Sequence, residues 1–178
     1  RHPPHLSGRQ RHRGALAAGL VLEPGLLLAD EPVSMLDVSV RAGVLSLLDR
    51  LRRDGGMGIV MITHDLSTAA HFADRIAVMY LGRIVEEGPA HDVIHAPQHP
   101  YTKALLSIVP RPDPRERSLG TILTGETPNP RNLPTGCRFH PRCPVAVDRC
   151  RVEEPVLGPP VAATTPVEPG HTAACLLA

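Results

Sequence analysis

The sequence has 178 residues, a formal net charge of +1 and only 2% aromatic residues. Such a small charge and so few rings argue against a nucleic-acid-binding protein, which needs a basic field and stacking surfaces. No apolar run approaches the roughly 20 residues that span a bilayer, so we expect no membrane-spanning segment in the chain.

The first half of the chain alternates periodic apolar segments with short polar turns. Ser7 can cap a helix over residues 9–22, which Pro24 and Gly25 end. The continuous apolar run at 26–29 predicts a strand buried on both faces. Apolar residues at helical spacing predict a second helix over 38–53.

The same alternation continues to about residue 109. A second buried strand is predicted at 58–63 and a helix at 65–73. Residues 75–80 and 83–87 are expected to form a hairpin that turns at Leu81-Gly82. Alternating strands and helices indicate an α/β fold in which neighbouring strands are parallel.

Proline-rich sequence at 110–114 predicts a domain boundary, because proline extends neither a helix nor a central strand. We therefore expect an α/β domain over residues 1–109. An irregular extension rich in cysteine and proline is expected over residues 110–178.

Two carboxylates, Asp30 and Glu31, end the first predicted strand in the stretch LLLADEPVSMLD. The carboxyl ends of parallel strands line the crevice where α/β folds bind ligands. One carboxylate there can hold Mg²⁺, and its neighbour can activate a water for attack on phosphorus. His64 ends the next predicted strand in ITHD, so it is expected at the same rim.

These motifs occur in a recognisable order. LSGRQ, LLLADEP, SMLD and ITHD resemble the signature motif, Walker B strand, D-loop and switch histidine of ATP-binding-cassette (ABC) transporter subunits. APQHPYTKALL and GCRFHPRCPVAVDRC resemble the C-terminal extension of the oligopeptide/dipeptide permease ATPases. The resemblance implies a partial P-loop NTPase sheet with helices on both faces, followed by that extension.

The resemblance also implies a role for each motif. Asp30 would bind Mg²⁺, Glu31 would polarise the attacking water, and His64 would contact the γ-phosphate of ATP. Residues 34–37, which end at Asp37, would cross to a partner subunit. Three signature residues would act on the ATP held by that partner, where a helix N-terminus favours an anionic phosphate, namely Ser7, Gly8 and Gln10.

The sequence departs from the family pattern in two ways. It contains no G-x-x-x-x-G-K-[ST] phosphate loop, so we expect the C-terminal portion of a longer ATPase, unable to build its own ATP site. Arg9 replaces the second glycine of LSGGQ, which predicts weakened catalysis, with a neutral substitution as the alternative. Without the strand that carries the phosphate loop, an apolar sheet edge predicts poor solubility.

All four cysteines lie in the extension, at Cys137, Cys143, Cys150 and Cys175. Their gaps differ from the tight pairs of a zinc ribbon, which leaves an iron–sulfur cluster, structural zinc, or free thiols and disulfides as alternatives. Flanking arginines are expected to favour the thiolate state, at Arg138, Arg142, Arg149 and Arg151. Some related permease ATPases carry a [4Fe–4S] cluster at this pattern, so the resemblance favours the cluster.

The resemblance implies a cytoplasmic subunit, peripheral on the inner face of the membrane, that hydrolyses ATP to energise peptide import. Its partners would be membrane permease subunits, a second ATPase subunit (a copy or a sister chain) and, indirectly, a substrate-binding protein. The alternative is a non-catalytic remnant or regulatory half-cassette that donates only its signature motif. A cysteine-rich metal or nucleic-acid module gains no support from charge or aromatic content.

Overall fold

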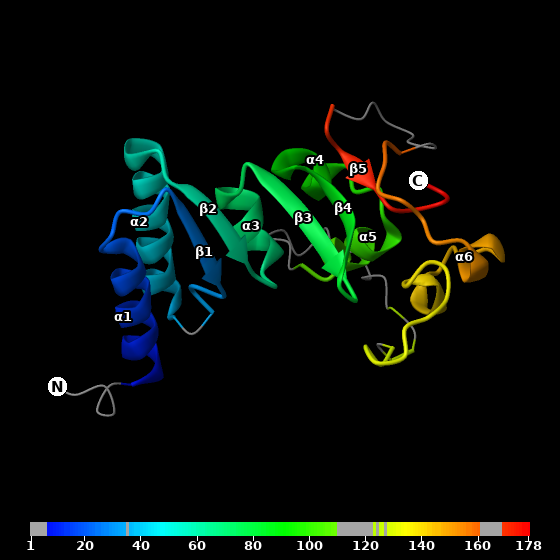
Figure 1. Ribbon diagram of the computed structural model, residues 1–178, viewed down its shortest axis with the longest axis horizontal. Helices are drawn as coiled ribbons and strands as arrows, with labels where there is room; N and C mark the ends of the chain where they lie inside the picture. The colour runs from blue at the N-terminus through cyan, green and yellow to red at the C-terminus, as the bar shows by residue number, and fades with distance from the viewer. Residues whose placement is uncertain (1–6, 35, 110–122, 124, 127, 161–168) are drawn as a thin grey trace, which may run out of the picture. The chain divides into compact units, whose positions relative to one another are not determined.

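The computed structural model describes residues 7–178 except 35, 110–122, 124, 127 and 161–168. It divides into two compact units, Arg1–Leu66 and Ser67–Ala178 (Figure 1). Among the described residues, no helix has the length and apolar character to cross a bilayer.

The described residues of the first unit form two α-helices and two strands. They are α1 (Gly8–Leu20), β1 (Leu26–Asp30), α2 (Val38–Gly55) and β2 (Gly58–Ile62). Gly56, with φ 65°, ends α2 in the left-handed conformation that glycine adopts without strain. All four elements lie within a few residues of their predicted bounds.

The strands β1 and β2 form a parallel pair whose register runs from Leu26 opposite Gly58 to Asp30 opposite Ile62. Because side chains alternate along a strand, β1 turns Leu27 and Ala29 to one face. Both helices pack on that face (Figure 1), where the buried core is completed by Leu48 and Met57. The expected parallel α/β arrangement is confirmed.

The opposite face of this sheet is apolar and exposed. Leu26 and Leu28 of β1 are 62% and 69% exposed, and Val60 and Ile62 of β2 are 50% and 52% exposed. The expectation that both strands are buried on both faces was therefore wrong for this unit. The two helices that the unit contributes cover only the face to which Leu27 and Ala29 point.

The chain continues with α3 (Leu66–Phe72) and an antiparallel hairpin of β3 (Arg75–Tyr80) and β4 (Arg83–Pro89). The hairpin turns at Leu81 and Gly82, with φ angles of 44° and 76°. Two consecutive positive φ angles are typical of the tight turn that matches strand twist, so the predicted hairpin is confirmed.

Four further helical segments and one strand lie in the described residues of the second unit. They are α4 (Ala90–His95), α5 (Pro100–Ser107), the short 3₁₀ helix His140–Arg142, α6 (Arg149–Val152) and β5 (Thr172–Ala173). The strand β5 adds to the hairpin by pairing antiparallel with β4. The predicted boundary at 110–114 lies outside the described residues.

The core of the second unit joins the hairpin to the extension. Phe139 of the extension is 1% exposed and packs with Ile76, Val78, Tyr80 and Val93. Its ring centroid lies 5.2 Å from that of Tyr80, in an edge-to-face arrangement that aromatic pairs favour. The extension therefore shares one compact unit with the hairpin.

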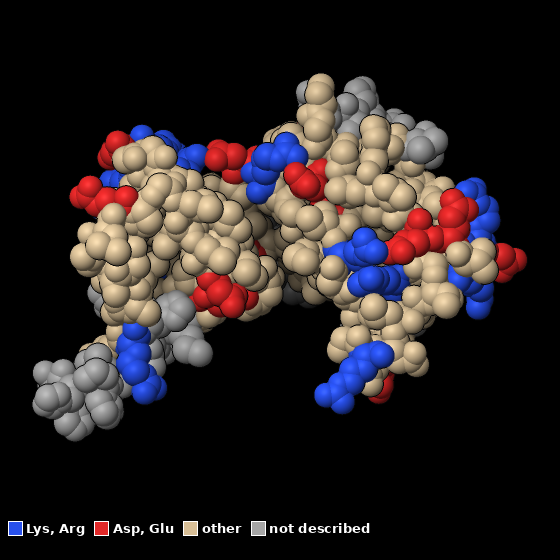
Figure 2. Space-filling model, in the orientation of Figure 1, with Lys and Arg blue, Asp and Glu red and all other residues tan. Residues whose placement is uncertain are grey.

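Basic and acidic side chains lie beside one another on the face seen in Figure 2. Several pairs in the second unit are ion pairs, among them Arg75–Glu87 at 2.8 Å and Arg83–Glu154 at 3.0 Å. Such exposed pairs contribute about 0–1 kcal/mol each, so packing around Phe139 rather than surface charge holds this unit together.

Candidate functional site

The carboxyl ends of β1 and β2 bring Glu31 and His64 into contact. Glu31 follows the last residue of β1 and adopts a φ of 46°, a conformation that only a few per cent of non-glycine residues adopt. Its backbone N–H donates to the carbonyl of Ile62, at the end of β2, over 2.9 Å. This bond fixes the turn that points the Glu31 side chain across to the neighbouring strand end.

One carboxylate oxygen of Glu31 receives two hydrogen bonds from His64. Oε1 lies 2.6 Å from the ring Nδ1 and 3.1 Å from the backbone nitrogen of His64. An ionised carboxylate only accepts, so Nδ1 carries a proton. The side chain of His64 is 81% exposed, and its Nε2 would donate to an incoming oxygen only after the ring gained a second proton.

Asp30 lies at the carboxyl end of β1 on the exposed face of the sheet. Its carboxylate is accessible, and Mg²⁺ prefers such oxygen ligands. The chemistry and position of Asp30 therefore fit the ion.

The loop that follows Glu31 folds back on it. The Ser34 hydroxyl donates to the carbonyl of Glu31 over 3.1 Å. Asp37 occupies the N-cap position of α2, and its carbonyl accepts the Arg41 N–H at 2.8 Å. The predicted D-loop therefore leads from the Glu31 turn directly into α2.

An ion pair that the sequence did not predict lies beneath this rim. Arg41 on α2 contacts Asp65, the residue after His64, with 3.2 Å between Nη1 and Oδ2. Both side chains are about one third exposed. The pair connects α2 to the segment that carries His64, and no local pattern links two residues 24 positions apart.

The signature residues form a capping box at the start of α1. The Ser7 hydroxyl accepts the Gln10 N–H at 3.2 Å, and the Gln10 side chain accepts the Ser7 N–H at 3.1 Å. Gly8 is the first residue of the helix, so its backbone belongs to the N-terminal turn that favours anions. The side chain of Arg9 lies outside the described part of the chain.

A second polar cluster, around Glu86, was missed by sequence reasoning. Glu86 is 0% exposed; its Oε1 accepts the Gln98 N–H at 2.7 Å, and its Oε2 accepts the His99 N–H at 2.9 Å. His171 Nε2 lies 2.8 Å from the same Oε1. The carboxylate thus joins β4, the α4–α5 loop and the C-terminal segment, which are distant in sequence.

His99 in this cluster caps α5. Its Nδ1 accepts the Tyr101 N–H at 3.1 Å, so the ring must be neutral at that nitrogen. Burial lowers the pKa of His99 to about 4, and the positive charge of Lys103 acts in the same direction. His99 is therefore a neutral structural histidine at pH 7.

The four cysteines are all free thiols and lie near one another in the second unit. Burial raises the pKa of Cys137 and Cys143 above the usual range, and the other thiols add to the rise. Backbone N–H groups of Phe139 and His140 act in the opposite direction on Cys137. Within the described residues, no three His, Cys, Asp or Glu side chains form a metal site.

The expected effect of the flanking arginines is not seen at Cys137 and Cys143, whose pKa values are raised rather than lowered. Three of the arginines are engaged elsewhere. Arg138 donates to the carbonyl of Leu81, Arg149 pairs with Glu153, and Arg151 lies 3.8 Å from Asp148. Arginines that flank the cysteines in sequence therefore do not lower the pKa of Cys137 or Cys143.

Comparison with known proteins shows what the chain is similar to. Residues 85–150 match the family described as the oligopeptide/dipeptide transporter, C-terminal region. The chain is 49% identical, over 98% of its length, to a probable peptide ABC transporter ATP-binding protein of Sinorhizobium fredii. Over 88% of its length it is 52% identical to the dipeptide transport ATP-binding protein DppF of Haemophilus influenzae.

The oligopeptide transport ATP-binding protein OppF of Salmonella typhimurium is similarly related, at 49% identity over 88% of the chain. The alignments cover 48% of each of these three proteins, so the chain spans about half the length of the curated relatives it matches. The predicted resemblance to ATP-binding subunits of oligopeptide/dipeptide ABC transporters is confirmed.

Proposed function

We propose that the chain is the C-terminal part of an ATP-hydrolysing subunit that energises peptide import through an ABC permease. The contact between Glu31 and His64 at the carboxyl ends of β1 and β2 carries this proposal. It sets a carboxylate and an exposed imidazole at one rim, where a water and a terminal phosphate would be handled.

Each residue then has a chemical role. Asp30 holds Mg²⁺, which neutralises charge on the phosphates when it is bound. Glu31 orients the attacking water and accepts its proton once His64 releases Oε1. His64 contacts the γ-phosphate through Nε2 after it has released Oε1 and its ring proton has moved from Nδ1 to Nε2. Asp37 belongs to the loop that reaches a partner subunit.

The signature residues Ser7, Gly8 and Gln10 serve the ATP bound by that partner. The capping box holds the first turn of α1 in place, so its N–H groups and positive helix end are preorganised for an anion. The partner is a second ATPase subunit, either a copy or a sister chain. Permease subunits anchor the pair on the cytoplasmic face of the membrane, with a substrate-binding protein acting upstream.

A half-cassette that only donates its signature motif is the second candidate. One observation favours it: the capping box holds Ser7 and Gln10 in place at the start of α1. In this case Glu31 would have no catalytic role, whereas Ser7 would still contribute to a partner's ATP site.

Phosphate release separates the two candidates when the chain is mixed with an intact family cassette and with the N-terminal half of a relative, which supplies a phosphate loop. If the chain only donates its signature motif, it should raise turnover by the intact cassette; Ser7→Ala should abolish this increase and Glu31→Gln should not change it. If the chain is a catalytic subunit, Glu31→Gln should also lower the turnover. Ser46→Ala and Glu23→Gln, exposed residues of the same unit, are the matched controls.

The cysteines support a further part of the proposal, a [4Fe–4S] cluster with zinc as the alternative. What supports it is that all four thiols are free and lie near one another, and thiolate is a ligand for soft metals. Cys137, Cys143, Cys150 and Cys175 would be the ligands. Broad absorbance near 400 nm in anaerobically purified protein supports the cluster, whereas a colourless preparation with stoichiometric zinc supports zinc.

A further inference from the structure

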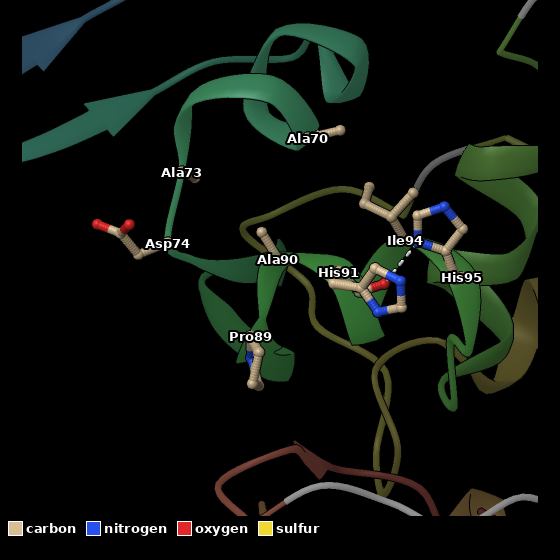
Figure 3. Close-up of a pocket in the computed structure, with 8 residues that line it drawn as sticks. All are labelled: Ala70, Ala73, Asp74, Pro89, Ala90, His91, Ile94 and His95. Atoms are coloured by element: carbon tan, nitrogen blue, oxygen red, sulfur yellow. Dashed lines mark hydrogen bonds between the residues drawn. The ribbon is translucent and has the colours of Figure 1, made fainter. Parts of the chain in front are cut away.

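A hollow of about 330 Å³ lies beside α3 and α4 in the second unit (Figure 3). Its walls are mostly apolar, and the rings of His91 and His95 stack at an interplanar angle of 26°, so their free nitrogens do not converge on one ligand. The carboxylate of Asp74 points away from both rings. These residues form no ligand set, whereas the first unit joins a charged pair directly to the rim described above.

Arg41 links the start of α2 to the segment that carries His64. Its backbone N–H donates to the Asp37 carbonyl at 2.8 Å, which places it in the first turn of the helix. Its guanidinium contacts Asp65, with 3.2 Å between Nη1 and Oδ2. Asp65 directly follows His64, so this ion pair ends one residue from the imidazole at the rim.

The backbone of His64 is therefore held from both sides. On one side its N–H donates to Glu31 Oε1 at 3.1 Å. On the other side the Asp65 N–H donates to Thr63 Oγ1 at 3.1 Å, and the Asp65 carboxylate contacts Arg41. Consecutive Cα atoms lie about 3.8 Å apart, so Asp65 cannot move far without displacing His64.

This ion pair supplies geometry rather than stability. Arg41 and Asp65 are 32% and 31% exposed, and ion pairs with this much exposure add little to the stability of a fold. A displacement of about 1 Å at a reacting group, however, can reduce a rate about a hundredfold. Glu31 also holds a φ of 46°, and such strain persists only where surrounding contacts fix it.

We propose that Arg41 is a positioning residue that acts through Asp65 to hold His64 at hydrogen-bonding distance from Glu31. This role rests on the proposed function, in which Glu31 and His64 handle the water and the terminal phosphate. Arg41 acts on the reaction only through the placement of His64, so its loss should lower the rate of hydrolysis and leave the interaction with ATP unchanged.

Amide hydrogen exchange of the 178-residue chain, resolved to single residues by fragmentation in the mass spectrometer, tests the positioning role without ATP. Arg41→Met removes the positive charge, Arg41→Lys retains it, and Asp65→Asn removes the negative charge. Arg52→Met is the matched control, because Arg52 pairs with Asp49 on the same helix at 3.1 Å and has a similar exposure of 31%.

We expect the His64 amide to exchange about fivefold faster in Arg41→Met and in Asp65→Asn, which corresponds to about 1 kcal/mol of local opening free energy. In Arg41→Lys and Arg52→Met it should exchange at the rate of the original chain. An unchanged rate in Arg41→Met would overturn the proposal. So would an equal acceleration in Arg52→Met, or at amides in the middle of α2 such as that of Leu48, because the role of Arg41 would then be structural.

Phosphate release in the presence of the N-terminal half of a relative gives a second readout. Arg41→Met should lower kcat about tenfold and leave KM for ATP unchanged, and Arg41→Lys should restore kcat. A raised KM with unchanged kcat would overturn the positioning role. Absence of turnover in the original chain would count against the proposed function alone, and the His64 exchange rates would still decide the role of Arg41.

Discussion

Glu86 is the residue on which three segments of the second unit depend. Its two carboxylate oxygens accept N–H groups from the α4–α5 loop, and one of them also contacts His171. With no exposed surface, Glu86 has no water to replace a lost partner. The neighbouring Glu87 is one third exposed and pairs with Arg75, so it offers a comparison at the same strand.

We expect Glu86→Gln to destabilise the second unit by about 1–3 kcal/mol, because an amide nitrogen would face a backbone N–H donor. Glu87→Gln should cost no more than about 1 kcal/mol. Both tyrosines of the chain, Tyr80 and Tyr101, pack in this unit, so tyrosine fluorescence in urea reports its unfolding. Equal midpoints for the two variants would contradict the role given to Glu86.

His99 gives the second unit a defined response to acid. Its pKa is about 4 in the folded chain against about 6.5 when unfolded, so the unfolded chain binds the proton first as the pH falls. The resulting stabilisation is complete above about pH 6.5 and is lost as the pH falls toward 4. It amounts to about 3 kcal/mol.

His99→Asn tests this response, since asparagine keeps an N-cap acceptor and does not titrate. Urea unfolding at a series of pH values between 4 and 7 should show a steeper loss of stability in the original chain than in the variant. Parallel pH profiles would show that other groups cause the acid response.

At the scale of elements, the loop before α6 depends on a close backbone approach at Gly136. A Cβ there would lie 2.5 Å from the carbonyl oxygen of Cys150 and 2.7 Å from the backbone of Arg151. The next residue, Cys137, donates its N–H to that same carbonyl over 2.9 Å. Gly136 therefore sets the distance between two of the cysteine-bearing segments.

Gly136→Ala should destabilise the second unit by about 1–3 kcal/mol more than Gly125→Ala. Both glycines have positive φ angles, of 62° and 81°, but a Cβ at Gly125 would meet nothing within 4 Å. The difference in stability between the two variants therefore measures the cost of the steric clash at Gly136, because the cost of a positive φ is common to both. Equal free energies of unfolding for the two variants, measured by tyrosine fluorescence, would contradict this role of Gly136, because the loop would then accommodate the added methyl group.

Local patterns predicted the elements well, because each depends on neighbouring residues. The turn at Leu81-Gly82, the parallel strands and the meeting of Glu31 with His64 all follow from periodicity and strand order. The contact of Glu86 with His171, 85 positions away, has no such signal. The raised pKa values of Cys137 and Cys143 likewise arise from burial that only tertiary packing produces.

At the scale of the whole molecule, the open face of β1 and β2 governs solution behaviour. Leu28 and Val60 are paired across the strands and are 69% and 50% exposed. An apolar sheet face of this kind favours association between chains.

The double variant Leu28→Thr, Val60→Thr should therefore increase the monomeric fraction in size-exclusion chromatography without lowering stability, because threonine retains β-propensity. Leu27→Thr, on the buried face at 8% exposure, should have the opposite effect. A monodisperse original chain would contradict the account of this face.

The central claim, which rests on the proposed function, is that Glu31 and His64 form the water side of an ATP site. The most direct test supplies a phosphate loop, as the N-terminal half of a family relative added in trans, and measures phosphate release. We predict turnover that falls about 10²–10⁴-fold in Glu31→Gln and is unchanged in the exposed control Glu23→Gln. Turnover that Glu31→Gln leaves intact would contradict the claim.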